Sequence, residues 1–270
     1  MTEKIYINGK EALDNIHLRS LTFGEGVFET FRYKSALPIN IDKHIKRLRE
    51  GANLLHLMCP GEYDLIDIIN EAYKNSGIKD AYIKICLLSS GPGQFYENSK
   101  RTDILTIVKN YNPPKTAFKA CINSYRRHSE SPILKIKSTN YLENILSRRE
   151  AIAKGYEESI FLNEKDQITE GSVSNIFWYK DKTLYTPSIE CGLLPGTTRE
   201  TVLSISKEIG INTCEGAFEL GHILDSEYAF FTNALIGTVS ITDIERNSFN
   251  IASASYKSIQ KKLLQYLRWD

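Results

Sequence analysis

The sequence lacks the features that mark several large classes of protein. Its five cysteines are an odd number and include no CxxC pair, so we expect neither a disulfide framework nor a structural zinc site. The formal net charge of +1 gives no excess of one sign that would recruit nucleic acid or an anionic membrane. Any phosphate-bearing ligand must therefore be bound by local groups.

Export signals and common catalytic motifs are also missing. The first residues, MTEKIYINGKEALDN, contain no apolar core of a signal peptide, and no apolar run is long enough to span a bilayer. Scattered thiols suit a reducing compartment, so we expect a cytoplasmic protein that binds no membrane. The five histidines are isolated, and there is no GxSxG, Walker or GxGxxG motif. We therefore expect no metal site.

What is present is an ordinary globular composition. The 270 residues are 41% hydrophobic and 25% charged, which suffices for a sizeable core in one or two domains. Asn112, Pro113 and Pro114 interrupt the pattern, because adjacent prolines resist both a helix and a central strand. We predict an N-terminal α/β domain over residues 1–112, a linker over 113–118 and a C-terminal domain over 119–270.

Periodicity predicts helices and strands mixed along both halves. In the first half, strands are expected at 27–33, 37–41, 81–89 and 104–109, a helix capped by Asp42, and a second helix at 65–73. In the second half, helices are expected at 141–153, 198–209 and 253–267, with strands at 119–125, 159–162, 175–179, 183–185 and 228–232. Hairpins with intervening helices favour an α+β fold over a doubly wound sheet.

Lys137 is the first candidate for chemistry. It lies between apolar Ile136 and a run of small polar residues, just before a predicted helix. A lysine in such surroundings can lose its proton near neutral pH and attack an aldehyde. The alternative is a solvated lysine at the end of a strand, which is the commoner situation.

Glu170 is the second candidate. It precedes the small residues 171–174 and then an apolar strand. A carboxylate there could pair with the protonated ring nitrogen of a cofactor and make the ring a better electron acceptor. The alternative is a carboxylate in an ordinary turn, since Glu-Gly is common in loops.

Two further segments could bind an anion. Gly192 to Arg199 form a glycine-containing turn with Thr197 and Thr198 at the start of a helix, where backbone N–H groups and hydroxyls can cradle a phosphate. An ordinary capped helix would look similar. Arg47 lies at the edge of the buried face of its helix and could reach inward to the phosphate, or it could be solvated and paired with a nearby glutamate.

Together these segments occur in a characteristic order, and the chain resembles the class IV aminotransferases, which are fold-type IV pyridoxal 5'-phosphate (PLP) enzymes. The resemblance covers nearly the whole chain and rests on six segments, at residues 23–30, 44–48, 137–141, 170–175, 194–199 and 231–234. It implies two domains of the D-amino acid aminotransferase type, with a smaller N-terminal α/β domain and a larger, β-rich C-terminal domain with helices. It also implies a homodimer.

The resemblance implies a role for each matching residue. Lys137 matches the lysine that holds PLP, and Glu170 matches the partner of the pyridine nitrogen. Leu194 matches the residue that packs on the ring. The phosphate would be held by Arg47, Gly196, Thr197, Thr198 and the turn of Asn233 and Ala234, where Ala234 has no hydroxyl and offers only main-chain donors. Asn140 and Tyr141 are expected beside the cofactor, and Glu29 and Thr30 beside the substrate.

The family contains branched-chain aminotransferases, D-amino acid aminotransferases and 4-amino-4-deoxychorismate lyases. Residues 123–132, 185–188 and 232–235 look like the lyase subgroup. The D-amino acid enzymes carry an arginine–x–histidine pair after the strand that is here 83–88, whereas this chain has Ser89-Ser90-Gly91-Pro92-Gly93-Gln94. Arg32 or Arg126 could replace the missing cation for a substrate carboxylate.

The leading hypothesis is therefore a lyase that releases pyruvate and forms 4-aminobenzoate for folate synthesis, acting on a small-molecule substrate. One alternative is an aminotransferase for branched-chain or D-amino acids. Another is a PLP-binding homologue without efficient catalysis.

Overall fold

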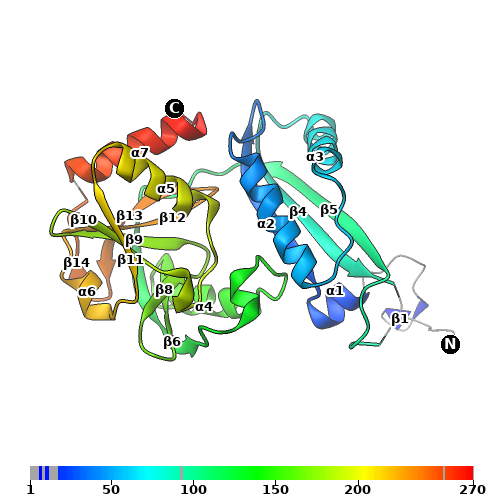
Figure 1. Ribbon diagram of the computed structural model, residues 1–270, viewed down its shortest axis with the longest axis horizontal. Helices are drawn as coiled ribbons and strands as arrows, with labels where there is room; N and C mark the ends of the chain where they lie inside the picture. Colours follow the sequence, from blue (N-terminus) through cyan, green and yellow to red (C-terminus); the bar gives the residue numbers. More distant parts are fainter. Residues whose placement is uncertain (1–5, 8–9, 12–17, 92–93, 252, 270) are drawn as a thin grey trace.

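In the computed structural model of the chain, residues 6–7, 10–11, 18–91, 94–251 and 253–269 are described (Figure 1). Among them are a three-stranded sheet, a nine-stranded sheet and a two-stranded pair, β1 (Tyr6–Ile7) with β2 (Lys10–Glu11). The two larger sheets are covered by separate groups of helices and lie in the two halves of the molecule (Figure 1). The predicted α+β class is confirmed.

The three-stranded antiparallel sheet has the order β3-β4-β5, with β3 at Gly26–Lys34, β4 at Asp80–Ser90 and β5 at Arg101–Asn110. Helices α2 (Ile41–Leu54) and α3 (Glu62–Ser76) bury apolar side chains against one face of it. Because side chains alternate along a strand, Val27 and Phe31 face these helices, while Phe28 and Thr30 point to the other side. Helix α1 (Leu18–Phe23) precedes β3.

The chain crosses from one sheet to the other between Asn110, the end of β5, and Ala117, the start of β6 (Ala117–Arg127). The two prolines lie in this crossing, where no strand or helix is formed. The linker predicted over 113–118 overlaps it, although the first residues of β6 fall inside that range.

The nine-stranded sheet runs in the order β11-β10-β9-β12-β13-β6-β7-β8, with β14 paired to β13. Its further strands are β7 (Glu158–Asn163), β8 (Ile168–Gly171), β9 (Asn175–Lys180), β10 (Thr183–Pro187), β11 (Asn212–Gly216), β12 (Tyr228–Asn233), β13 (Gly237–Ile244) and β14 (Asn247–Ser248). The helical elements are η1 (Pro132–Lys135), α4 (Leu142–Ala153), η2 (Ile189–Cys191), α5 (Thr197–Glu208), α6 (Leu220–Leu224) and α7 (Ala254–Leu267). One core cluster is centred on Trp178 and Phe231, and another on Phe177 and Phe230.

One predicted strand is wrong. Residues 37–41 form no strand, because the amide of Ile41 donates to the carbonyl of Pro38 and turns the chain into α2. That helix consequently begins at Ile41 after Asn40, so Asp42 lies in its first turn and does not cap it. The central strand β13 was not predicted, because its polar residues mask a regular apolar alternation. In the described part of the chain, no helix has the length and apolar character needed to cross a membrane.

Candidate active site

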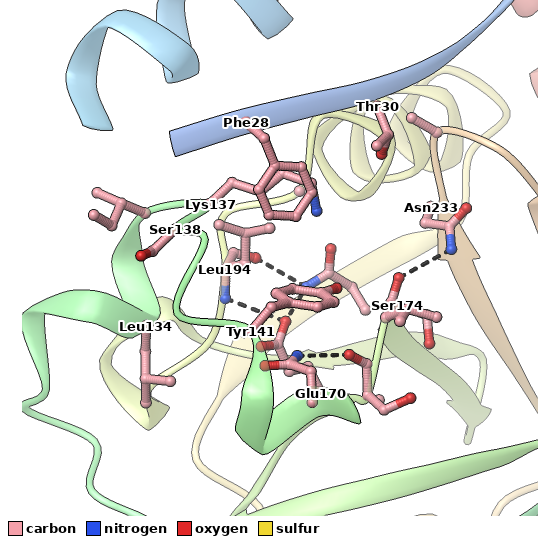
Figure 2. Close-up of a pocket in the computed structure, with 18 of the residues that line it drawn as sticks. Phe28, Thr30, Leu134, Lys137, Ser138, Tyr141, Glu170, Ser174, Leu194 and Asn233 are labelled. Carbon is pink, nitrogen blue, oxygen red and sulfur yellow. Dashed lines mark hydrogen bonds between the residues drawn. The ribbon is translucent and has the colours of Figure 1, made fainter. Parts of the chain in front are cut away.

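A cavity of about 330 Å³ lies between the two sheets (Figure 2). Strands β3 and β4 contribute Phe28, Thr30 and Lys84 to its wall, and the nine-stranded sheet and its loops contribute the rest. Every residue that the sequence placed at the cofactor lines this cavity: Arg47, Lys137, Asn140, Tyr141, Glu170, Leu194, Gly196, Thr197, Thr198, Asn233 and Ala234. Thr30, expected at the substrate, lines it too.

Lys137 lies in the loop between η1 and α4, which runs beside β3. The amide of Phe28 donates to the carbonyl of Lys137 at 2.8 Å, and the amide of Thr139 donates to the carbonyl of Gly26 at 2.9 Å. These bonds aim the lysine into the cavity, where Nζ lies 4.7 Å from the centre of the Phe28 ring and 5.8 Å from that of Tyr141 (Figure 2).

The surroundings of Lys137 favour its neutral form. Removal from water lowers the pKa of its amine to about 8, with a further contribution from the charge of Arg47. Glu29 and Glu170 act in the opposite direction and keep the pKa from falling further. Lys137 can therefore act as a nucleophile or a base near neutral pH.

Glu170, at the end of β8, is held by three donors. Its Oε1 accepts from Arg127 Nη1 at 2.8 Å, while Oε2 accepts from the amide of Leu194 at 3.2 Å and from Asn175 Nδ2 at 3.4 Å. Burial raises the pKa of this carboxyl to about 7, and the charge of Arg127 limits the rise. The group is thus poised to exchange a proton near neutral pH with a ring nitrogen in the cavity.

Arg127 is a residue whose importance the sequence did not suggest. Its side chain is 1% exposed, pairs with Glu170 and also with Glu143 at 2.9 Å, and lies 3.4 Å from the centre of the Phe161 ring. The alternation along β6 would have identified it, because Asn123, Tyr125 and Arg127 face inward while the adjacent Arg126 faces solvent.

The first turn of α5 provides an anion cradle. Gly196 precedes the helix, so the free N–H groups and positive end of the helix face the cavity beside Thr197 and Thr198. The buried hydroxyl of Thr198 has no hydrogen-bond partner among the described residues. An unpartnered buried hydroxyl is costly without a ligand, so it indicates a polar group that binds here.

Arg47 lies beside this cradle, and its guanidinium is held by groups that do not line the cavity. It donates through Nε and Nη2 to Glu29 at 2.7 and 2.8 Å and through Nη1 to the carbonyl of Pro195 at 2.9 Å. His44 Nδ1 lies 2.7 Å from the same carboxylate, and His44 Nε2 lies 3.3 Å from the hydroxyl of Thr197. Helix α2 is thereby joined to the first turn of α5.

Glu29 does not line the cavity. It is 1% exposed and stands on the face of β3 opposite to Phe28 and Thr30. Burial alone would raise the pKa of its carboxyl, but the charges of Arg47 and His44 together lower it to about 2. The substrate contact expected for Glu29 therefore has no counterpart in this geometry, since its carboxylate is occupied in holding Arg47.

Asn233 joins the hairpin between β12 and β13 to the loop after Glu170. Its Oδ1 accepts from the amides of Leu235 and Ile236, both at 2.9 Å, and its Nδ2 donates to the carbonyl of Val173 at 2.9 Å. On the opposite wall, Asn140 Nδ2 donates to the carbonyl of Gly24 at 2.8 Å. The ring of Tyr141 meets that of Phe28 edge-on at 5.3 Å.

This set of groups fits PLP. The cavity offers an amine of lowered pKa, a buried carboxyl for a ring nitrogen, and a phosphate cradle with an unpartnered hydroxyl. Within the described residues, no group of three or more histidine, cysteine, aspartate or glutamate side chains could hold a metal ion. Arg32 and Arg126, considered as cations for a carboxylate, do not line the cavity and pair with Asp80 and Asp166.

Comparison with known proteins agrees with this geometry. The family described as amino-transferase class IV matches residues 26–244. The chain is 29% identical over 266 residues to the aminodeoxychorismate lyase of Bacillus subtilis, covering 94% of this chain and 91% of that one.

Two solved structures share the fold. One is a protein of Legionella pneumophila proposed to be a 4-amino-4-deoxychorismate lyase, with a TM-score of 0.87, 27% identity, and coverage of 92% of this chain and 93% of that one. The other is the branched-chain aminotransferase of Thermoproteus uzoniensis with norvaline, with a TM-score of 0.87, 27% identity, and coverage of 98% and 95%. The predicted fold type is confirmed.

Proposed function

This chain belongs to the class IV aminotransferases, a family of PLP-dependent enzymes, and from that premise we propose that it is a 4-amino-4-deoxychorismate lyase. The reaction releases pyruvate and forms 4-aminobenzoate, a precursor for folate synthesis. Family membership alone is shared with aminotransferases, so the proposal depends on the shape and charge of the cavity.

The proposed roles follow from where each group lies. When bound, PLP supplies an aldehyde that combines with amines and a ring that withdraws electrons. Arg47, the Gly196–Thr197–Thr198 turn and the Asn233–Ala234 turn would hold its phosphate, and Leu194 would pack on its ring beside Asn140 and Tyr141. Glu170 would keep the ring nitrogen protonated. Glu29 would position Arg47, and Thr30 would face the substrate.

Lys137 would then act as the base. Its amine of lowered pKa would take the proton from C4 of the substrate ring. Cleavage of the bond between the ring carbon and the enolpyruvyl oxygen would release the enolate of pyruvate, which takes up one proton to balance the one that Lys137 removes. The ring becomes aromatic, which drives the elimination. Thr30 and Lys84 line the same wall and can orient the ring during this step.

The observation that carries the proposal is an aromatic wall with a lysine, Lys84, beside it. Phe28 and Tyr141 suit a flat six-membered ring, and Lys84 Nζ lies 4.1 Å from the centre of the Phe28 ring. In the described part of the chain, Lys84 makes no salt bridge with a carboxylate. Lys84 is therefore available for a carboxylate of the substrate, in place of the arginine–histidine pair that this sequence lacks.

A product assay tests the proposal. Holoenzyme incubated with synthesised aminodeoxychorismate should release equal amounts of pyruvate and 4-aminobenzoate, and the visible absorbance of PLP should persist through turnover. Holoenzyme given leucine or D-alanine alone should keep that absorbance. Rapid bleaching by either amino acid, reversed by 2-oxoglutarate, would contradict the lyase.

A branched-chain aminotransferase is the second candidate. It is favoured by the Thermoproteus uzoniensis structure and by the apolar side chains of Ile133, Leu134 and Val173 in the cavity wall, which suit an aliphatic substrate. The transaminase panel run beside the product assay decides between them. A PLP-binding homologue without efficient catalysis would turn over neither substrate while still giving a borohydride-stable adduct on Lys137.

The proposal includes a homodimer in the cytoplasm. Helix α4, next to the cavity, exposes Leu142, Leu146 and Ile152 at 63%, 49% and 61%, an apolar surface that a second copy could cover. Light scattering of the holoenzyme should give twice the mass of the chain.

A further inference from the structure

A cluster of cation and aromatic rings at one end of the cavity has no role in the chemistry above. Arg32 continues the face of β3 that carries Phe28 and Thr30, two residues farther along the strand. Its guanidinium makes a bidentate pair with Asp80, through Nε at 2.8 Å and Nη2 at 2.6 Å. Asp80 thus occupies two of the five N–H donors of this guanidinium.

Two rings lie against the same guanidinium. Its central carbon lies 4.1 Å from the centre of the Tyr111 ring and 5.0 Å from that of Trp269. Tyr111 belongs to the crossing between the two sheets, and Trp269 follows α7, whose C-terminal end points toward the three-stranded sheet (Figure 1). Lys34 Nζ also donates to the carbonyl of Trp269 at 3.3 Å. Segments far apart in the sequence thus meet at Arg32.

Both rings also contact the β12–β13 hairpin, whose tip lines the cavity. The hydroxyl of Tyr111 donates to the carbonyl of Leu235 at 2.6 Å, and burial raises the pKa of Tyr111, which keeps that proton in place. A Cβ on Gly237 would lie 3.5 Å from Trp269, so the indole lies beside the first residue of β13, which pairs with Asn233 next to the turn. Asn233 fixes the other side through the carbonyl of Val173.

We propose that Arg32, Tyr111 and Trp269 form a clamp that positions the hairpin tip, residues 233–236, against the three-stranded sheet and so sets how tightly the cavity holds its ligands. The three are positioning residues that touch neither cofactor nor substrate. The cavity has one wall on each sheet, so a loose clamp would let the Asn233–Ala234 turn move relative to Arg47 and Thr198. The inference holds for elimination and transamination alike, and it rests only on this cavity being the PLP site.

The test compares Tyr111→Phe and Trp269→Ala with Tyr63→Phe and Tyr266→Ala, whose rings are 83% and 37% exposed. Hydrogen–deuterium exchange of the holoenzyme is followed in peptides covering 232–238, together with the rate of PLP loss on dilution. Tyr111→Phe removes one hydroxyl, and we expect exchange and PLP loss to accelerate about three- to tenfold, the value of one net hydrogen bond. Trp269→Ala should give a larger effect, and Trp269→Phe an intermediate one.

Neither readout requires turnover, so failure of the lyase assay leaves this test intact. A kinetic split adds to it, because a positioning role should raise KM for whichever substrate is used more than it lowers kcat. If Trp269→Ala does not fold, the nearly isosteric Tyr111→Phe variant decides alone. Exchange and PLP loss in Tyr111→Phe equal to those of Tyr63→Phe would overturn the clamp.

Discussion

Two buried carboxylates on opposite sides of the cavity, Glu29 and Glu170, have similar partners and opposite properties. Each pairs with an arginine, yet the pKa of Glu29 is about 2 and that of Glu170 about 7. Glu29 has Arg47 on both oxygens and His44 as well, whereas Glu170 shares Arg127 with Glu143. A buried carboxylate with positive partners of its own thus stays ionised and holds a neighbour in place. A buried carboxylate that shares its arginine with a second carboxylate can exchange a proton.

The largest effect is expected at Lys137, the amine whose pKa would be lower still without these two carboxylates. Lys137→Ala should reduce turnover by at least about a thousandfold, because both covalent attachment and the base are lost. Borohydride reduction followed by peptide mass spectrometry should find PLP on Lys137 in the natural protein and on no peptide of the variant. Lys135→Ala, two residues away and exposed, is the matched control. Colourless natural protein without an adduct would remove the PLP assignment altogether.

Glu170→Gln and Glu29→Gln should separate catalysis from stability. The first should slow the proton-abstraction step by about a hundredfold or more without lowering the free energy of unfolding. The second should lower the free energy of unfolding by about 3 kcal/mol, because Arg47 loses its buried counter-charge. Chemical denaturation and single-turnover kinetics measure the two effects. If both variants lost only the rate of proton abstraction, or both lost only stability, the proposed contrast between Glu29 and Glu170 would be contradicted.

The pH dependence of stability in the PLP-free protein should have opposite signs at the two sites. The pKa of Glu29 is depressed on folding, so its contribution is present above about pH 4.5 and is lost as the pH falls toward 2. The pKa of Glu170 is raised, so stability falls by up to about 3 kcal/mol as the pH rises from 4.5 through 7. Urea unfolding between pH 4.5 and 8 should show this fall, and Glu170→Gln should abolish it.

Arg127→Met should make Glu170 still harder to ionise. We expect the pH titration of the bound PLP absorbance to shift and the protein to lose about 2 kcal/mol of stability, because Glu170 and Glu143 lose their shared partner. Arg127→Lys should restore part of the shift. Arg126→Met removes the adjacent but exposed arginine and should change neither quantity. Equal spectra for the two methionine variants would argue against a tuning role.

The smallest effect is expected in the phosphate cradle. Thr198→Ala removes a hydroxyl that has no protein partner, so PLP affinity should fall about fivefold while the PLP-free protein keeps its stability. Ser206→Ala, on the same helix, removes a second buried hydroxyl without a partner, outside the cavity. Equilibrium titration with PLP should leave Ser206→Ala unchanged. Equal losses in both variants would mean that Thr198 does not contact the ligand.

The chemical groups of the site were predictable because the segments that carry them occur together in a characteristic order, although each segment alone had an ordinary alternative. Lys137 before a helix, Glu170 before small residues, and Thr198 in the first turn of a helix become specific only in combination. Their roles in binding PLP remain predictions for the variants above. Glu29 was expected beside the substrate, but the alternation of side chains along β3 puts it on the face opposite to its neighbour Thr30, away from the cavity.

By itself the sequence determined the family, the α+β class, and the residues able to react with an aldehyde or bind a phosphate, because these depend on residue type and short-range order. Only the tertiary structure decided that Arg127 pairs with Glu170, that Lys84 lies beside the Phe28 ring, and that Tyr111 and Trp269 lie against Arg32. These contacts join segments far apart in the chain. Their pKa values follow from burial and from which charged groups each guanidinium or carboxylate contacts, and no local sequence pattern records those contacts.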